Sequence, residues 1–265
     1  MRKYKDKVIW ITGASSGIGE AVAYRFAKAG AKLILTSRKE DLLEKVAAKC
    51  REEGAADAWT LPCDLGKLDE LHATAIQAWN IHGTIDVLVA NAGISQRCET
   101  DKADMQLIRK VMELDFCSPA IITKAILPKM LEQGGGQLVC TGSIAGLFGS
   151  RQRCAYGSAK AALQRFYETI NAEYWESGIR ATVIIPGRVR TAISMSALEA
   201  GCREHGKMDP GQEKGISCEK AAEKIYKAIA RCRREKLVGG TELLMAYFKR
   251  FLPGLCFRIS RSVGN

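Results

Sequence analysis

Short apolar runs alternate with longer amphipathic segments over most of the chain. Runs such as VIWIT and KLILT have no polar alternation, which is typical of strands buried on both faces. The pattern predicts seven strands, at 8–12, 32–36, 58–61, 85–90, 137–141, 180–186 and, as a short last one, 237–240.

Helical patterns fill the intervals between these runs, for example at 18–29, 39–53, 68–82 and 154–177. Strands separated by helices form parallel β-α-β units with right-handed crossovers. The sequence therefore predicts the α/β class, with a doubly wound parallel sheet of about seven strands. In such a sheet, ligands bind beyond the carboxyl ends of the strands, at the switch point.

The chain has 265 residues, of which 47% are apolar. This is enough to bury a full core without disulfide or metal support. The sequence contains no repeat at solenoid spacing and no low-complexity linker. We therefore expect one domain over residues 1–265.

The net charge is +11, from 40 basic and 29 acidic residues. A basic chain raises the question of a nucleic-acid partner. From Arg231 onward, however, eight Lys or Arg stand against two Asp or Glu, so +6 of the excess lies in the C-terminal part. The first 230 residues carry the remaining +5 and show no basic face interleaved with aromatic residues. We therefore expect no nucleic-acid partner.

Ten cysteines are scattered without a Cys-x-x-Cys pair or a histidine at metal-ligand spacing. We expect free thiols in a reducing compartment and no metal site. The first apolar run is too short for a signal peptide, and no apolar stretch reaches the roughly 18 residues of a spanning helix. The expected location is the cytoplasm.

A glycine-rich turn, TGASSGIG at 12–19, lies directly between the first strand and the first helix. Glycines there allow a tight turn and let the backbone approach a pyrophosphate, whose charge faces the helix amides. Glycines also cap helices and form ordinary turns, so the position after strand one carries the argument. The candidate cofactor contacts in this turn are Gly13, Ser15, Ser16, Gly17, Ile18 and Gly19.

After the second strand stands Arg38, followed by Lys39, where an NAD-selective site normally has an acidic residue. A guanidinium binds the 2′-phosphate of NADP(H) through charge-assisted hydrogen bonds, whereas a carboxylate repels it. The sequence therefore favours NADP(H) over NAD(H). In the alternative interpretation, the two basic residues merely begin a solvated helix.

Two further turns follow predicted strands. Asp64 and Leu65 come after the third strand, where Asp64 would meet the adenine edge or, alternatively, cap the next helix. Asn91, Ala92 and Gly93 come after the fourth, where small residues let the backbone run close to a cofactor. A simple turn would look the same, so these residues add weight only together with the other motifs.

The candidate chemical group is Ser143 after the fifth strand, with Tyr156 and Lys160 on the following helix. A spacing of four places Tyr156 and Lys160 on one helical face. A free phenol titrates near pH 10, and a nearby ammonium favours its ionised form. Ser143 could donate a hydrogen bond to a substrate oxygen where charge develops. Tyr and Lys four apart are common on ordinary helices, so the prediction depends on all three residues following a nucleotide turn.

Together these motifs, with PGRVRT at 186–191, resemble the classical short-chain dehydrogenase/reductase family over residues 5–191. The resemblance implies a single-domain, three-layer α/β/α Rossmann-type fold, a nicotinamide cofactor, and Tyr156 as the acid and base. It also implies that Lys160 holds the nicotinamide ribose and that Thr191 lies near the carboxamide. The cofactor contacts implied in the last motif are Pro186, Gly187, Val189 and Thr191.

One position departs from the family pattern. The family commonly has an asparagine on the fourth helix that supports a proton relay, and Asp115 occupies this place here. If the relay uses the backbone carbonyl, aspartate would serve. If it needs a neutral side chain, the activity or its pH dependence would change.

The last part of the chain has the least regular pattern. In the family, the region corresponding to 192–217 is a lid over the substrate, and Met195, Leu198 and Met208 would either line an apolar pocket or belong to the core. The stretches GKMD at 206–209, VGG at 238–240 and FLPGL at 251–255 resemble the dehydrogenase/reductase member 7 group. That group is related to hydroxysteroid dehydrogenases, and the analogy suggests a bulky apolar, lipid- or steroid-like substrate.

Residues 241–265 form a basic amphipathic C-terminal extension. It would pack on the domain or on a neighbouring subunit, which we favour, or lie on an anionic membrane surface. By the family resemblance, the chain would be a homodimer or homotetramer assembled through its fourth and fifth long helices.

The sequence thus predicts an NADP(H)-dependent enzyme that interconverts a carbonyl and an alcohol on a small hydrophobic molecule. An NAD-linked dehydrogenase of the same family is the first alternative. The second is a nucleotide-binding sensor or scaffold with weakened catalysis, which only Asp115 encourages.

Overall fold

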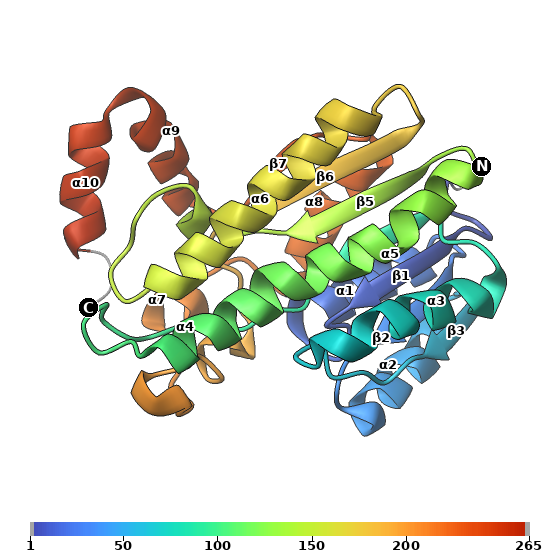
Figure 1. Ribbon diagram of the computed structural model, residues 1–265, viewed down its shortest axis with the longest axis horizontal. Coiled ribbons are helices and arrows are strands. Elements are labelled where there is room, and N and C mark those ends of the chain that lie inside the picture. The colour runs from blue at the N-terminus through green and yellow to red at the C-terminus, as the bar shows by residue number, and fades with distance from the viewer. Residues whose placement is uncertain (1–2, 263–265) are drawn as a thin grey trace.

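Seven strands form one parallel sheet in the computed structural model, which describes residues 3–262 (Figure 1). The strand order is β3-β2-β1-β4-β5-β6-β7, and every pairing is parallel. The order reverses between β1 and β4, which creates the switch point of a doubly wound sheet. The strands are Val8–Thr12 (β1), Lys32–Thr36 (β2), Asp57–Thr60 (β3), Val87–Ala90 (β4), Gly136–Thr141 (β5), Ile179–Pro186 (β6) and Glu235–Val238 (β7).

Helices cover both faces of the sheet. One face carries α1 (Gly17–Ala27), α2 (Glu40–Glu52) and α8 (Cys218–Ala230). The other carries α3 (Leu71–His82), α5 (Ser118–Glu132) and α6 (Cys154–Tyr174). The predicted three-layer α/β/α Rossmann-type fold is therefore confirmed.

The side chains of β1 contribute to the apolar cores on both faces of the sheet. Ile9 and Ile11 pack with α1, α2 and α8, while Val8 and Trp10 pack with α3, α5 and α6. Alternate residues of a strand point to opposite faces, so an apolar residue at every position fills two layers. The indole of the fully buried Trp10 donates a hydrogen bond to Thr36 Oγ1 at 2.9 Å, which satisfies its polar atom inside the core.

The last strand differs from the sequence prediction. It begins at Glu235 and ends at Val238, two residues earlier at each end than the predicted 237–240. Gly239 lies outside the strand because its backbone packs against Glu242, and a Cβ at this position would be 2.3 Å from Glu242 Oε1. The charged Glu235 and Lys236 tolerate a strand position because β7 is the edge of the sheet.

A helical arm precedes α5 on one side of the molecule. It consists of α4 (Met105–Met112) and a π-helical segment, Glu113–Cys117, which continues directly into α5. Asp104 caps α4 by accepting a hydrogen bond from Leu107 N at 2.8 Å. Single π turns inside longer helices are frequent at functional sites.

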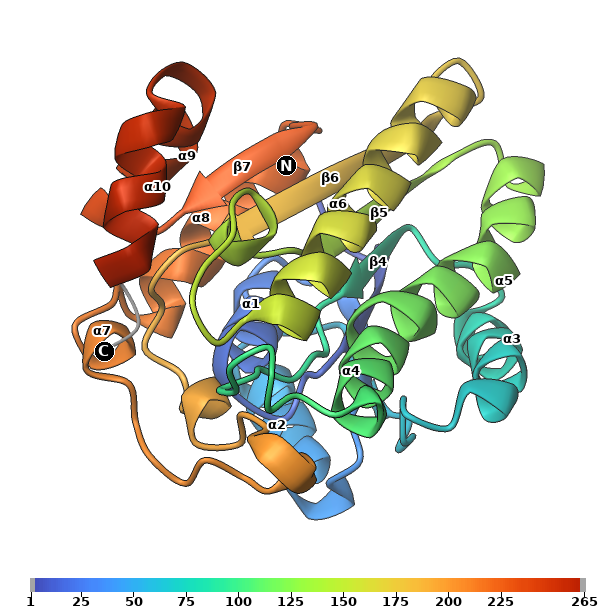
Figure 2. The ribbon, with the colours of Figure 1, turned by 60° about the vertical axis from the view of Figure 1, so that its left-hand side comes forward.

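The chain after β6 forms two further segments. Residues 192–217 contain two 3₁₀ turns and the short helix α7 (Pro210–Glu213), and they are joined to the loop after β4 by backbone hydrogen bonds of Leu198. Beyond β7, α9 (Leu244–Phe251) and α10 (Pro253–Ser262) form a hairpin that stands apart from the helices covering the sheet (Figures 1 and 2). No helix in residues 3–262 is long and apolar enough to cross a membrane.

Candidate active site

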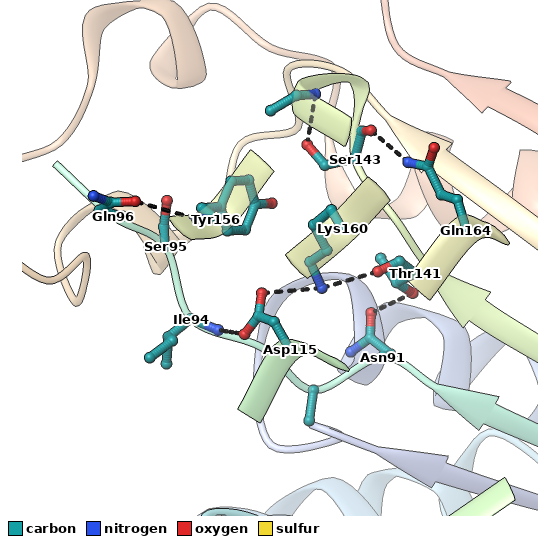
Figure 3. Close-up of polar contacts among 12 residues, drawn as sticks. Asn91, Ile94, Ser95, Gln96, Asp115, Thr141, Ser143, Tyr156, Lys160 and Gln164 are labelled. Carbon is teal, nitrogen blue, oxygen red and sulfur yellow. Dashed lines mark hydrogen bonds and ion pairs between the residues drawn. The ribbon is translucent and has the colours of Figure 1, made fainter. Parts of the chain in front are cut away.

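The carboxyl ends of β1, β4 and β5 are tied together by hydrogen bonds. Thr12 Oγ1 accepts from the backbone N–H groups of Asn91 at 3.1 Å and Ala92 at 3.2 Å. The Asn91 amide donates to the carbonyls of Thr12 and Gly13, at 3.2 and 3.3 Å, and its oxygen accepts from Thr141 Oγ1 at 3.1 Å (Figure 3). Asn91 therefore holds the turn formed by residues 91–93 against the glycine-rich turn.

The glycine-rich turn needs its glycines. Gly13 and Gly17 have φ values of +64° and +62°, a left-handed conformation that side chains disfavour. A Cβ on Gly19 would lie 2.2 Å from the Gly13 carbonyl oxygen, and one on Gly13 would lie 2.8 Å from Ala92 Cα. The turn therefore keeps its backbone open where α1 begins. Ser16 precedes α1 without a side-chain capping bond, which leaves the first amides of the helix available to an anion.

Loops after the other strands complete this edge. Thr191, after β6, approaches the turn closely, with its Cγ2 3.2 Å from the Cβ position of Gly17. Pro186 and Val189 are buried, and Gly187 packs against Glu242. The structure thus brings the 186–191 motif to the glycine-rich turn.

The residues after β2 and β3 lie farther along the same edge. Ser37 is buried, whereas Arg38 is exposed and Lys39 immediately precedes α2. Asp64 accepts a hydrogen bond from Gly66 N at 3.0 Å within its own turn and caps no helix, since the next helical turn follows Lys67. Leu65 is buried in the core.

Lys160 is a buried charged group of the site. Its Nζ lies 3.2 Å from Asp115 Oδ2 and donates to the Thr141 carbonyl at 3.1 Å (Figure 3). The ammonium is also 5.8 Å from the centre of the Tyr156 ring. A Cβ on Gly93 would come within 3.0 Å of Lys160 Nζ and 3.1 Å of Asp115 Oδ2. The absence of a side chain at Gly93 therefore leaves space for the ion pair.

Asp115 lies in the π-helical segment and is fully buried. Its Oδ1 accepts a hydrogen bond from Ile94 N at 2.8 Å. Among the described residues, its Oδ2 has the ammonium of Lys160 as an ionic neighbour but no hydrogen bond of good geometry. The π turn thus places the carboxylate beneath the loop after β4, against the lysine.

Burial and charge act on this pair together. Burial raises the pKa of Asp115, and the attraction of Lys160 and the Ile94 N–H offset part of that rise. Burial alone would lower the pKa of Lys160, but Asp115 and then Tyr156 outweigh it, so this pKa is raised. Lys160 therefore remains an ammonium at neutral pH, 3.2 Å from the Asp115 carboxyl group.

Tyr156 stands at the start of α6, where a buried glutamine holds the backbone. Gln96 Oε1 accepts from the N–H groups of Ala155 at 2.8 Å and Tyr156 at 3.1 Å. The tyrosine ring is partly buried, and its hydroxyl points toward the side of the site that carries Ser143 and Lys160 (Figure 3). Gln96 was not predicted, because its capping role depends on a loop far from α6 in the sequence.

Ser143 immediately precedes the 3₁₀ turn Ile144–Gly146 after β5. Its Oγ accepts from Ala145 N at 3.2 Å, and its carbonyl accepts from Gln164 Nε2 at 2.8 Å. The backbone of Ser143 is thus held by α6, while the hydroxyl proton is left to donate. Among the predicted catalytic residues, the structure brings Ser143, Tyr156, Lys160 and Asp115 to one place.

A second charged group near Tyr156 was also not predicted. Arg153 has its Cζ 5.3 Å from the centre of the Tyr156 ring and its Nη2 3.6 Å from Asp209. Arg97 Nε donates to Asp209 Oδ1 at 3.0 Å. Burial and then the repulsion of Arg153 lower the pKa of Arg97 to about 10. Asp209 thereby attaches the 192–217 segment to the loops that border Tyr156.

Comparisons with known proteins agree with this geometry. The family model described as short chain dehydrogenase matches residues 7–200. A dehydrogenase/reductase SDR family protein 7-like from Drosophila melanogaster is 34% identical, over 96% of this chain and 79% of its own. The family member 7B from Mus musculus is 33% identical, over 97% of this chain and 81% of its own.

Two solved structures have the same fold. A short-chain dehydrogenase/reductase from Burkholderia phymatum, in complex with NAD, superposes with a TM-score of 0.83 at 23% identity and covers 96% of both chains. A short-chain dehydrogenase from Sphingobium yanoikuyae, in complex with NADPH, has a TM-score of 0.80 at 25% identity and covers 94% of both chains. The resemblance predicted from the motifs and from the C-terminal stretches is confirmed. The chain belongs to the short-chain dehydrogenase/reductase family of oxidoreductases.

Proposed function

We propose that this protein is an NADP(H)-dependent oxidoreductase that interconverts a carbonyl and an alcohol, with Tyr156 as proton donor and acceptor. The observation that carries the proposal is the buried ammonium of Lys160, 5.8 Å from the Tyr156 ring, at the sheet edge that also bears the glycine-rich turn. A buried charge is costly unless it has a task or a partner. Here the partner Asp115 holds it beside the phenol.

The residues of this edge fit a dinucleotide. The open glycine-rich turn and the uncapped start of α1 would receive the pyrophosphate. When bound, the nicotinamide supplies or accepts the hydride. The residues that would hold the cofactor are Gly13, Ser15, Ser16, Gly17, Ile18, Gly19, Arg38, Asp64, Leu65, Asn91, Ala92, Gly93, Tyr156, Lys160, Pro186, Gly187, Val189 and Thr191.

The preference for NADP(H) over NAD(H) rests on Arg38. Its exposed side chain follows β2, and no acidic residue stands between β2 and Glu40. A guanidinium at this position would pair with a 2′-phosphate. The relative from Sphingobium yanoikuyae was solved with NADPH, which supports the proposal, whereas the Burkholderia phymatum protein was solved with NAD.

Three side chains divide the proton chemistry between them. Tyr156 would give its proton to the carbonyl oxygen during reduction and take one from the alcohol during oxidation. Lys160 would favour the ionised phenol by its charge. Ser143 would donate a hydrogen bond to the same substrate oxygen, because its own Oγ accepts from Ala145 N and its hydroxyl proton is left to donate.

Asp115 would act on Tyr156 indirectly, through the charge of Lys160. We expect Asp115→Asn to move the pH profile of alcohol oxidation to lower pH. Without the Asp115 carboxylate, no neighbouring negative charge offsets the Lys160 ammonium, so its full positive charge acts on the Tyr156 phenol. Burial, no longer opposed by Asp115, would then lower the pKa of Lys160. Lys160 would lose its proton at a lower pH, and the activity at high pH would be lost with it. The asparagine oxygen would still accept from Ile94 N.

The measurement is kcat as a function of pH for the two proteins. Glu113→Gln serves as control, because Glu113 lies in the same π segment but is exposed. It should leave the profile in place. An Asp115→Asn profile that is unchanged, or displaced to higher pH, would remove Asp115 from the proposed proton chemistry.

The proposed substrate is a hydrophobic, lipid- or steroid-like molecule. Leu198, in the proposed lid 192–217, is buried in an apolar cluster against which Tyr156 packs, while Met195 and Met208 are exposed. The apolar residues packed against Tyr156 would favour a bulky apolar substituent. The other proposed partner is the chain itself, as a homodimer or homotetramer.

A panel assay tests the enzyme against its main rival, a sensor that binds nucleotide without turnover. NADPH consumption is followed with ketones, aldehydes and steroids, together with NADPH binding in their absence. We expect turnover with apolar carbonyl compounds. Tight NADPH binding with no turnover on any of these compounds would favour the sensor.

A further inference from the structure

The hairpin of α9 and α10 exposes an unusual number of large apolar side chains. Phe251 is 73% exposed and Phe257 is 64% exposed, more than any other large apolar residue described. Single exposed apolar residues need no explanation, but a contiguous group marks an interaction surface. The exposed members of this group, hereafter the hairpin surface, are Leu244, Tyr247, Phe251, Leu252, Leu255 and Phe257.

The apolar positions on α9 follow the helical period. Leu244, Tyr247 and Phe251 are three and four residues apart and so share one face, while Met245 on the opposite side is buried. Leu252 extends this face into the turn before α10. One side of α9 is thus already covered, and the exposed stripe is additional to it.

Basic residues surround this apolar surface without acidic ones. Residues 243–262 contain Lys249, Arg250, Arg258 and Arg261 and no Asp or Glu. All four are exposed, and none is in a salt bridge within residues 3–262. The hairpin therefore combines an apolar stripe with uncompensated positive charge, the pattern of a helix that lies in a membrane interface.

The hairpin is short, and hydrogen bonds anchor it at its base. Its two helices pack mainly against each other, and both stand beyond the end of β7 in Figures 1 and 2. At the base, Glu242 Oε1 accepts hydrogen bonds from Arg188 N at 2.7 Å and Gly240 N at 2.9 Å. This ties the hairpin to the loop after β6, at the edge of the sheet that carries the candidate active site.

We propose that the hairpin surface docks on a membrane whose surface carries anionic phospholipids. The apolar stripe would enter the boundary between headgroups and acyl chains, and the four basic residues would face lipid phosphates. The helices have 8 and 10 residues. At about 1.5 Å per residue they are far shorter than the ~30 Å hydrocarbon core, so docking is peripheral.

A second copy of the chain is the other candidate occupant. In a two-fold contact the same surface meets itself, so the basic residues of both hairpins would be brought together. Since residues 243–262 contain no acidic side chain, such a contact would lack opposite charges of its own. Lipid phosphates provide the missing complement, and the charge therefore favours the membrane.

Co-sedimentation of the full chain with vesicles tests the proposal. The vesicles are pure phosphatidylcholine, or phosphatidylcholine mixed with phosphatidylglycerol, each at low and high salt. We expect binding to the anionic vesicles at low salt, weak binding to the neutral ones, and a marked loss at high salt because surface charge is screened. No binding to anionic vesicles at low salt would overturn the proposal.

Two variants separate the apolar from the electrostatic contribution. The apolar variant is Tyr247→Ser, Phe251→Ser and Leu252→Ser; the basic variant changes Lys249, Arg250, Arg258 and Arg261 to Gln. Each should reduce the partition coefficient on anionic vesicles by at least about tenfold. The exposed positions make loss of folding unexpected, and circular dichroism checks it.

Matched variants at exposed positions elsewhere serve as controls. They are Leu42→Ser, Trp59→Ser and Met105→Ser for the apolar set, and Lys5, Lys45, Lys110 and Lys220 to Gln for the basic set. Both should bind vesicles as the parent chain does. Equal losses in controls and hairpin variants would overturn the proposal. It would also be overturned if the hairpin variants changed only the oligomeric mass measured by light scattering.

Discussion

Replacing Tyr156 with phenylalanine is expected to lower turnover by about a thousandfold while NADP(H) binding stays nearly unchanged. The substitution removes only the hydroxyl, which in our proposal exchanges the proton that accompanies the hydride. The ring would keep its position, because α6 is held at its start by Gln96 and the apolar cluster around the ring is untouched. The measurements are kcat with the best substrate of the panel and the NADPH dissociation constant by fluorescence titration.

Tyr174→Phe is the matched control for this variant. Tyr174 lies on the same helix, at its far end, and has no part in the proposed chemistry. Its loss should leave kcat within about twofold, as is usual for changes away from a site. Turnover that persists in Tyr156→Phe would assign the proton transfer to another group and would remove Tyr156 from the mechanism.

The second large effect is expected at the cofactor. Arg38→Asp should lower the ratio of kcat/KM for NADPH to that for NADH by at least about a hundredfold, because a charge-assisted hydrogen bond is worth ~1.5–3 kcal/mol and a carboxylate adds repulsion. The side chain is exposed and its loss should not disturb the core. The ratio of kcat/KM for NADPH to that for NADH is obtained from initial rates measured with each coenzyme over the same series of substrate concentrations.

Lys45→Asp provides the control, since it makes the same change of charge on the exposed side of α2. It should leave the coenzyme ratio unchanged. If Arg38→Asp also leaves the ratio unchanged, the basic pair after β2 only begins a solvated helix, and the NAD-linked alternative gains support.

The fold could be predicted well because its strands are unbroken apolar runs. The structure has β1 and β2 at the predicted 8–12 and 32–36, since each run ends where a turn at the sheet edge begins. The prediction was poorest at β7, where the edge position allows Glu235 and Lys236 into the strand and where Gly239 belongs to the contact with Glu242. An apolar pattern does not reveal an edge strand whose outer face is solvated.

The site could be predicted in its motifs but not in all of its contacts. The four-residue spacing of Tyr156 and Lys160 is a local property of one helix, so the sequence is sufficient to pair them. The ion pair of Lys160 with Asp115 joins α6 to a π turn of another helix, and hydrophobic periodicity does not indicate where a π turn occurs. The contacts of Asp209 with Arg97 and Arg153 likewise depend on how the 192–217 segment folds back.

The contacts of Lys160 also explain why the departure at Asp115 need not abolish the chemistry. Asp115 is fully buried behind Gly93, and its Oδ2 lies 3.2 Å from the Lys160 ammonium. Its effect would therefore reach the phenol only through the charge of Lys160, which is why we expect a displaced pH profile and retained turnover.

The central claim is that a phenol governed by a buried lysine exchanges a proton beside a nicotinamide ring. A crystal structure of the full chain with NADP⁺ and an alcohol found by the panel assay tests it most directly. The account predicts the Tyr156 hydroxyl within about 3.2 Å of the alcohol oxygen, with the reacting carbon over the nicotinamide ring. A Tyr156 hydroxyl directed away from both, with the alcohol held by other side chains, would contradict it.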